Sequence, residues 1–234
     1  FKHLTTSYAE TWTTVFDAKD TSVLYAATTG SPGPTQGSGP SAEAGVYISK
    51  NNGQTWNQRN CGLPASSSTA VWCNIDSTNN LVVGISGGAP SFTNPTKPFY
   101  DGGIYYSLDG AGTWMKASTP VNVDSITFWK FIKTGDTLIT YGLSGDLNKA
   151  VGFLKSYDNG RSWQRFTSPL ANKPIVDFSV APDGLTIVAM VRDSNAVYTT
   201  SNGGYSWTRI SISLNGVLEF HPQSVDTLFF TAQN

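Results

Sequence analysis

Short apolar runs alternate with polar turns along the whole chain, and no segment sustains the 3.6-residue apolar period of an amphipathic helix. A unit of two such runs, three and then four residues long, recurs along the sequence. The units are Val15–Asp17 with Val23–Ala26, Asn74–Asp76 with Leu81–Gly84, Phe131–Lys133 with Thr137–Thr140, Ser179–Ala181 with Leu185–Val188, and Glu219–His221 with Thr227–Phe230. This pattern predicts an all-β chain of paired antiparallel strands, with helix nearly absent.

An eight-residue motif, Ser/Thr-x-Asp/Asn-x-Gly-x-Ser/Thr-Trp, follows each of the first four units. Its copies begin at Ser49, Ser107, Ser156 and Thr200, and the second copy has Ala111 in place of Gly. The Asp or Asn can accept backbone hydrogen bonds, Gly admits a positive φ, and Trp offers a large apolar surface to the next strand. We interpret the motif as a structural turn between two outer strands. Its key residues are Asn51, Asp109, Asp158 and Asn202, with Trp56, Trp114, Trp163 and Trp207.

These four copies resemble the Asp-box (BNR) repeat of sialidases, xyloglucanases, sortilin-type receptors and photosystem assembly factors. The resemblance covers four eight-residue segments and the spacing between them. It implies a β-propeller with the motif at the outer hairpin of each blade, remote from the active sites of those families. Sialidases use three arginines and a Tyr–Glu pair, and among the five arginines of this chain only Arg192 is expected near the loop face. Xyloglucanases use two larger propellers that face each other.

The spacing of the motif predicts how the blades close into a ring. The copies start 58, 49 and 44 residues apart, as expected for four-stranded blades. Stepping back from Ser49 finds Thr5–Trp12, a degenerate fifth copy, while the last two-strand unit has no motif after it. We therefore predict a single domain, residues 1–234: a five-bladed propeller of four-stranded antiparallel blades whose last blade is closed by strands from both termini. The alternative is a fragment of a larger propeller.

The composition of the chain limits the kinds of partner and the cellular compartment that we expect for it. The 15 basic and 16 acidic residues nearly cancel, which argues against nucleic acid as a partner, and no apolar run is long enough for a membrane span. The low charged fraction, 13%, and a start at Phe1 fit a secreted protein with its leader removed, or a trimmed chain. Cys61 and Cys73 are expected to form a disulfide rather than two free thiols. No metal site and no cofactor are expected.

Three long loops, 28–44, 86–102 and 142–150, are expected on the face opposite the motifs, where loops can vary. Aligning the inner strands brings together the following residues near that face: Thr13, Trp72, Trp129, Asp177 and Val217, then Val15, Asn74, Phe131, Ser179 and Glu219. The loops add Glu43, Tyr100 and Asp101. Because indoles stack on sugars and carboxylates bind hydroxyls, we expect a lectin-like, extracellular propeller that binds a glycan or a cell surface. Trp72 and Trp129 could instead pack between blades.

Two other functions remain open from the sequence. A glycoside hydrolase could use Asp177 and Glu219 as acid and base. A purely structural module could bind an extracellular protein through the loop face.

Overall fold

The computed structural model describes residues 9–30, 45–64, 71–75, 80–85, 102–124, 126–144, 150–166, 168–192, 196–210 and 216–232. For residues 9–12, 29–30, 71–75, 129, 144 and 232 it describes the backbone alone. Within these ranges there is no α-helix, and so no helix that could cross a membrane. The predicted all-β, antiparallel character of the chain is confirmed.

The strands of the described residues form four sheets of four strands and one two-stranded hairpin, and neighbours in each sheet are consecutive in the chain. The first two sheets contain β1 (Ala9–Phe16), β2 (Leu24–Gly30), β3 (Gly45–Ser49), β4 (Asn57–Gln58), β5 (Val71–Ile75), β6 (Leu81–Ile85), β7 (Gly103–Ser107) and β8 (Met115–Lys116). The next two contain β9 (Ile126–Thr134), β10 (Thr137–Ser144), β11 (Ala150–Ser156), β12 (Gln164–Arg165), β13 (Ile175–Val180), β14 (Ile187–Val191), β15 (Ala196–Thr200) and β16 (Thr208–Ile210). The hairpin consists of β17 (Gly216–Phe220) and β18 (Leu228–Ala232).

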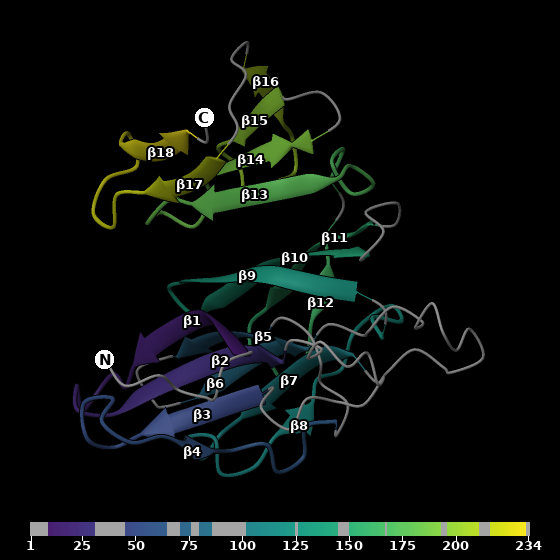
Figure 1. Ribbon diagram of the computed structural model, residues 1–234. Coiled ribbons are helices and arrows are strands. Elements are labelled where there is room, and N and C mark those ends of the chain that lie inside the picture. The colour runs from purple at the N-terminus through teal and green to yellow at the C-terminus, as the bar shows by residue number, and fades with distance from the viewer. Residues whose placement is uncertain are drawn as a thin grey trace.

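Successive sheets pack face to face, with the first strand of each sheet on the inside (Figure 1). Four apolar clusters fill the spaces between neighbouring sheets. They join β1–β4 to β5–β8, β5–β8 to β9–β12, β9–β12 to β13–β16, and β13–β16 to the hairpin. Second strands such as β6 and β14 are buried along their whole length because a neighbouring sheet covers each of their faces. Sheets that succeed one another in this way are the blades of a β-propeller.

The eight-residue motif forms the turn between the third and fourth strands. In the copy that begins at Ser156, the Ser162 N–H and hydroxyl donate to the two oxygens of Asp158, at 2.9 and 2.6 Å. The Gly160 N–H donates to the Ser156 hydroxyl at 2.9 Å, which ties the turn back to the end of β11. The indole N–H of Trp163 donates to the Gly160 carbonyl at 3.0 Å, so the Trp side chain closes over the turn.

In the copy that begins at Ser156, the glycine at the fifth position allows both a positive φ and close packing against the neighbouring sheet. Gly160 has φ 85°, and a Cβ there would lie 2.4 Å from Cγ2 of Val82 in the neighbouring sheet. Ala111 adopts a similar φ of 65° in its copy and is fully buried between the first two sheets. In that copy the Trp114 indole donates to the Arg59 carbonyl of the preceding sheet, at 2.8 Å, and not to its own turn.

The N-terminal part of the ring closure differs from the prediction. Trp12 lies in β1, the inner strand of the first sheet, and not at the start of an outer strand. Residues Thr11–Val15, β-branched except for Trp12, continue as one strand that pairs with β2 through a bulge between Thr11 and Thr13, so no motif-like turn interrupts them. Phe229 is in β18, in a different sheet. The rest of the proposed fifth copy, residues 5–8, lies outside the described residues.

The predicted disulfide is not present in this structure, because Cys61 is an exposed free cysteine. Its backbone has a different role: the Cys61 carbonyl accepts the Trp114 N–H at 2.8 Å and links the first sheet to the second. The side chain of Cys73, in β5, and the Ser-rich loop at 65–70 lie outside the described residues.

We predict that Gly160→Ala destabilises the protein by roughly 1–3 kcal/mol more than Gly53→Ala, because only the first adds a clash to the backbone strain. Gly53 has a comparable φ of 79°, but a Cβ there would meet only Trp56 Cζ2 at 3.7 Å. Urea denaturation of both variants measures the difference. Equal losses of stability would mean that the neighbouring sheet does not press on the Gly160 turn.

We also predict that the motif carboxylates contribute to acid sensitivity. Burial acts to raise the pKa of Asp109 and of Asp158, but hydrogen bonds, including those from Thr113 and Ser162, hold each pKa below its ordinary value. A folded-state pKa below the unfolded value of about 3.9 stabilises the fold at higher pH, and this contribution disappears as the pH falls through the folded pKa.

The double variant Asp109→Asn, Asp158→Asn tests this acid sensitivity, because Asn51 and Asn202 show that Asn fits the same position. Its stability should fall less than that of the wild type between about pH 5 and pH 2.5. Urea titrations at a series of pH values provide the measurement. Asp183, whose pKa is also lowered, keeps part of the acid sensitivity in both proteins. Parallel pH profiles would contradict the prediction.

Candidate functional site

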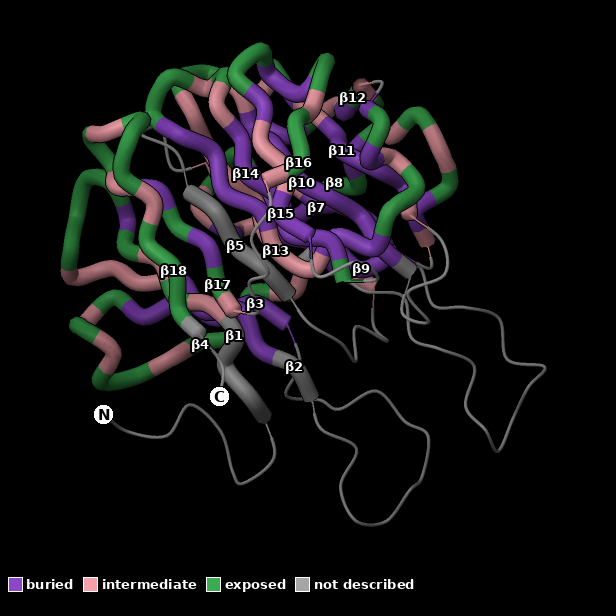
Figure 2. The backbone as a smooth tube through the Cα atoms, turned by 90° about the horizontal axis from the view of Figure 1, so that it is seen from above, coloured by how far each residue is buried: buried purple, intermediate pink, exposed green. Residues whose placement is uncertain are grey.

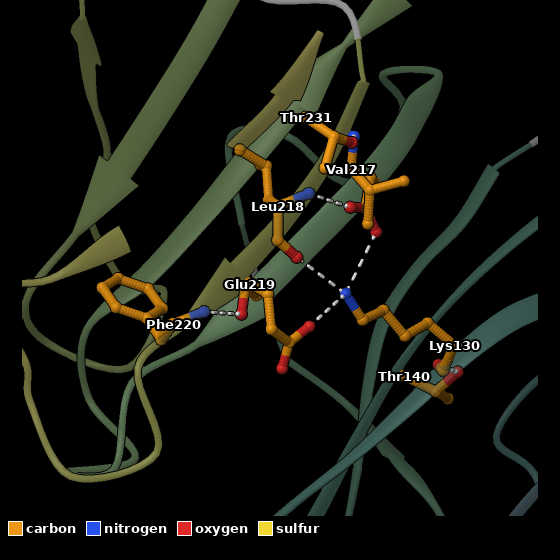
Figure 3. Close-up of polar contacts among 9 residues, drawn as sticks. Lys130, Thr140, Val217, Leu218, Glu219, Phe220 and Thr231 are labelled. Carbon is orange, nitrogen blue, oxygen red and sulfur yellow. Dashed lines mark hydrogen bonds and ion pairs between the residues drawn. The ribbon is translucent and has the colours of Figure 1, made fainter. Parts of the chain in front are cut away.

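A cluster of charged side chains joins the inner strands β9, β13 and β17 (Figure 3). The ammonium of Lys130 lies 3.4 Å from Oδ1 of Asp177 and 3.1 Å from Oε2 of Glu219, and it donates to the Leu218 carbonyl at 2.9 Å. Asp177 and Glu219 were both expected from the sequence, and the structure brings them to the same cation. Lys130 was not expected.

Strand pairing explains why sequence alignment missed Lys130. In the sheet β9–β12, counting inward from the motif, Leu154 pairs with Thr140, and Thr140 pairs with Phe131. In the sheet β13–β16, Tyr198 stands at the same distance from its motif; it pairs with Ala189, and Ala189 pairs with Phe178. The residues before Phe131 and Phe178, Lys130 and Asp177, are therefore equivalent. The sequence alignment placed Trp129 there, because it did not allow for the two-residue turn between β9 and β10.

The same counting places Thr13 and Trp72 at this position in β1 and β5, as the sequence alignment had it. Trp72, Lys130 and Asp177 thus occupy one register position in three successive inner strands. Next to this position, β9 has a register shift between Phe128 and Phe131, and β13 has one between Ile175 and Asp177. Such bulges turn a side chain away from the regular pleat and are frequent near functional sites.

Asp177 connects three strands. Its Oδ2 accepts the Leu218 N–H at 2.6 Å, and two residues along, the Ser179 hydroxyl accepts the Phe220 N–H at 3.0 Å. The N–H groups of β17 that point away from β18 thus bond to side chains of β13, and not to the backbone of another strand. Since Oδ1 faces Lys130, both carboxylate oxygens have partners.

Burial governs the electrostatics of this cluster. The Asp177 side chain is 14% exposed, and burial raises the pKa of its carboxyl above the ordinary value. The Lys130 charge and the N–H groups of Leu218 and Phe178 act in the opposite direction without cancelling the effect. The Glu219 side chain is 64% exposed, so its ion pair with Lys130 is largely solvent-screened. The cluster therefore combines a carboxyl and an ammonium that are both largely buried with a carboxylate that is accessible.

A shallow hollow lies beside the cluster, with a volume of about 10 Å³ that is enough for about one water molecule. It is lined by Lys130, Tyr141, Ile175, Val176, Asp177 and Phe178. The Tyr141 hydroxyl donates to the Lys173 carbonyl, and burial raises the pKa of Tyr141. No group of three His, Cys, Asp or Glu side chains within the described ranges is placed to hold a metal ion.

The other predicted ligand-binding residues lie outside the description in whole or in part. Trp72 and Trp129 are in β5 and β9, but their side chains are not described. Glu43, Tyr100 and Asp101 lie outside the described residues, as does most of the three long loops. Their placement around the cluster stays a prediction.

Comparisons with known proteins support the fold class defined above, the β-propeller. The structure is similar to a GH74 enzyme from Niastella koreensis (TM-score 0.60, 17% identity, 90% of this chain and 42% of that one). It is also similar to YCF48 bound to D1 peptide (TM-score 0.60, 15% identity, 94% of this chain and 60% of that one). A third similar structure is the GH74 xyloglucanase from Xanthomonas campestris (TM-score 0.58, 13% identity, 93% and 34%). At these identities the likeness concerns the fold alone.

At the level of sequence, no protein-family model matches the chain. The chain is 27% identical over 122 residues to vacuolar protein sorting/targeting protein 10 of Schizosaccharomyces pombe. This match covers 51% of the chain and 8% of the yeast protein, so the chain spans a small part of that relative. Together these comparisons define the molecule as a β-propeller and leave its activity to be argued from its own residues.

We predict that Lys130→Met destabilises the protein by about 2–3 kcal/mol at pH 7, because it leaves the buried Asp177 carboxylate without its cation. Lys116→Met is the matched control. Lys116 pairs with Asp124 at 2.9 Å, but these side chains are 37% and 41% exposed, so the loss should stay within about 0.5 kcal/mol. Thermal and urea unfolding measure both variants. Similar small losses would show that the cluster does not hold β9, β13 and β17 together.

Proposed function

We propose that this protein is a non-catalytic, lectin-like propeller that binds a glycan at the inner-strand position occupied by Trp72, Lys130 and Asp177. The observation that carries the proposal is the register of three successive strands. This register gives a tryptophan, a lysine and an aspartate equivalent positions, and Glu219 lies against the Lys130 ammonium. Aromatic rings stack on the apolar faces of sugars, and charged groups bind hydroxyls, so this set suits a saccharide.

The contacts of Asp177 favour binding over hydrolysis. A glycosidase needs one carboxyl that gives its proton to the leaving oxygen and a second carboxylate that acts across the sugar ring. Here Asp177 and Glu219 share one cation, and Asp177 also accepts the Leu218 N–H. The raised pKa of Asp177 is the feature that favours the alternative, a glycoside hydrolase with Asp177 as general acid.

Further details belong to the same proposal. We infer a five-bladed ring in which the β17–β18 hairpin is the inner half of the fifth blade, with Asp-box turns in the other four. The long loops 28–44, 86–102 and 142–150 are proposed to surround the site and to supply Glu43, Tyr100 and Asp101. Trp129, next to Lys130, is a further candidate for sugar contact. The proposed location is extracellular.

A protein ligand is the second candidate. One structural neighbour, YCF48, is described as bound to a D1 peptide, and the yeast sequence relative is a sorting/targeting protein. These observations are made on those proteins. A peptide ligand is the function that we propose for this chain if the glycan proposal fails.

A glycan array with the wild-type protein, combined with a reducing-sugar assay on the glycans that bind, tests the proposal. We expect binding without turnover. Trp72→Ala should weaken binding at least tenfold, about 1.4 kcal/mol, because the stacking surface is lost. Tyr205→Ala is the matched control: Tyr205 is 75% exposed in the motif turn, and its loss should leave affinity unchanged.

The outcomes separate the candidates. Turnover that disappears in Asp177→Asn or Glu219→Gln, with the fold intact by circular dichroism, would establish the hydrolase instead. Absence of both binding and turnover across the array would reject the glycan proposal in favour of a protein ligand.

A further inference from the structure

The Lys130 ammonium has no hydrogen-bond donor left for a ligand. An ammonium group carries three N–H donors and no acceptor. In this structure these donors meet the Leu218 carbonyl at 2.9 Å, Oε2 of Glu219 at 3.1 Å and Oδ1 of Asp177 at 3.4 Å. The Lys130 side chain is also largely buried. A ligand that bound to this cation would first have to displace one of the three acceptors.

The charges of the cluster act against an anionic ligand as well. One cation, Lys130, faces two carboxyl groups, those of Asp177 and Glu219. The Glu219 carboxylate alone balances the Lys130 charge, and an ionised Asp177 makes the sum negative. A ligand that carries a carboxylate or a sulfate is repelled by Glu219 and finds no free donor on Lys130. The cluster is therefore unsuited to an acidic glycan.

Glu219 is the member of the cluster that a ligand can reach, because its side chain is exposed whereas Asp177 and Lys130 are largely buried. Only Oε2 of Glu219 faces Lys130, and Figure 3 shows that the other oxygen of this carboxylate points away from the ammonium. None of the hydrogen bonds found among the described residues uses that second oxygen. A carboxylate accepts hydrogen bonds and donates none, so the ligand must supply the donors. A positively charged donor binds a carboxylate most strongly.

An aromatic side chain lies beside this carboxylate. Glu219 pairs with Phe229 across the β17–β18 hairpin, so their side chains are direct neighbours on one face of the sheet. Figure 2 shows β18 as largely exposed, and Phe229 is 55% exposed. Val217, two residues before Glu219 and on the same face, is 53% exposed. An aromatic ring attracts an ammonium group through its quadrupole, so Phe229 adds to the attraction that the Glu219 charge exerts.

We propose that the ligand of this propeller is an amino glycan, whose unacetylated hexosamine residues place their ammonium groups against Glu219 and Phe229; this rests on the glycan-binding function proposed above. The ammonium group donates to the Glu219 oxygen that points away from Lys130, while Lys130 holds the other oxygen in place. Phe229 and Val217 offer apolar surface to the C–H groups of the sugar ring. Neutral glycans bind less tightly than amino glycans, and acidic glycans bind least.

Titration calorimetry on the protein of residues 1–234 tests this ranking. The probes are hexasaccharides of the same linkage made of glucosamine, N-acetylglucosamine or glucuronate, and the peptide hexalysine. The pH is set between the pKa of an ordinary carboxyl group and that of the amino sugar, so that carboxylate and ammonium are both charged. We expect the glucosamine hexamer to bind about fivefold more tightly than the N-acetylated hexamer, and the glucuronate hexamer to bind most weakly. The difference should shrink as salt is added.

Three variants assign the preference to its residues. Glu219→Gln keeps the size of the side chain but removes its charge, so the preference for the glucosamine hexamer should disappear and the glucuronate hexamer should bind more tightly than it does to the wild type. Phe229→Leu should reduce the preference about twofold, since the ring is lost. Asp226→Asn is the matched control, because Asp226 is an exposed carboxylate in the turn of the same hairpin, and it should keep the preference. If circular dichroism shows that Glu219→Gln is unfolded, the ranking of the hexamers by the wild type and by Phe229→Leu decides.

The results that would overturn the amino-glycan proposal differ from those that would reject glycan binding. Equal affinities for the glucosamine and N-acetylglucosamine hexamers, or tightest binding of the glucuronate hexamer, would overturn the amino-glycan proposal and leave the glycan-binding function in place. Binding of hexalysine that is lost in Glu219→Gln, without binding of any hexasaccharide, would assign the site to a basic peptide. Absence of binding by all hexasaccharides and by hexalysine would reject both proposals.

Discussion

Apolar packing between successive sheets is the constraint on which the rest of this structure depends. A sheet that is apolar on both faces must bury both of them. Here the sheets between the first one and the hairpin do so by packing against the sheet before and the sheet after. Because neighbouring sheets lie close together, only small residues fit where a turn at the outer rim touches the next sheet. Gly160 lies against Val82 with no room for a methyl group, whereas Ala111, at the same position of its own copy, is fully buried in the cluster between the first two sheets. The motif therefore serves the contact between sheets as well as the turn itself.

The hairpin is where this packing pattern changes. One face of β17 packs against β14 through Leu218 and Phe220, and its outward N–H groups bond to the Asp177 and Ser179 side chains. Lys130 adds the connection to β9. At this end of the array, polar contacts from side chains therefore add to the apolar cluster that joins the hairpin to β13–β16. Such contacts are specific in geometry, and they place charged side chains on the inner strands, where the Glu219 carboxylate is largely exposed.

The sequence by itself determined the local structure: the all-β character, the paired strands, and the turns in which Asp158 and its equivalents accept backbone hydrogen bonds. These features depend on residues within a few positions of one another, so pattern and turn chemistry predict them. Tertiary structure alone decided the position of Trp12 in β1 and the equivalence of Lys130 with Asp177. Because side chains alternate between the faces of a strand, an error of one residue exchanges Trp129 for Lys130, and only long-range pairing reveals it.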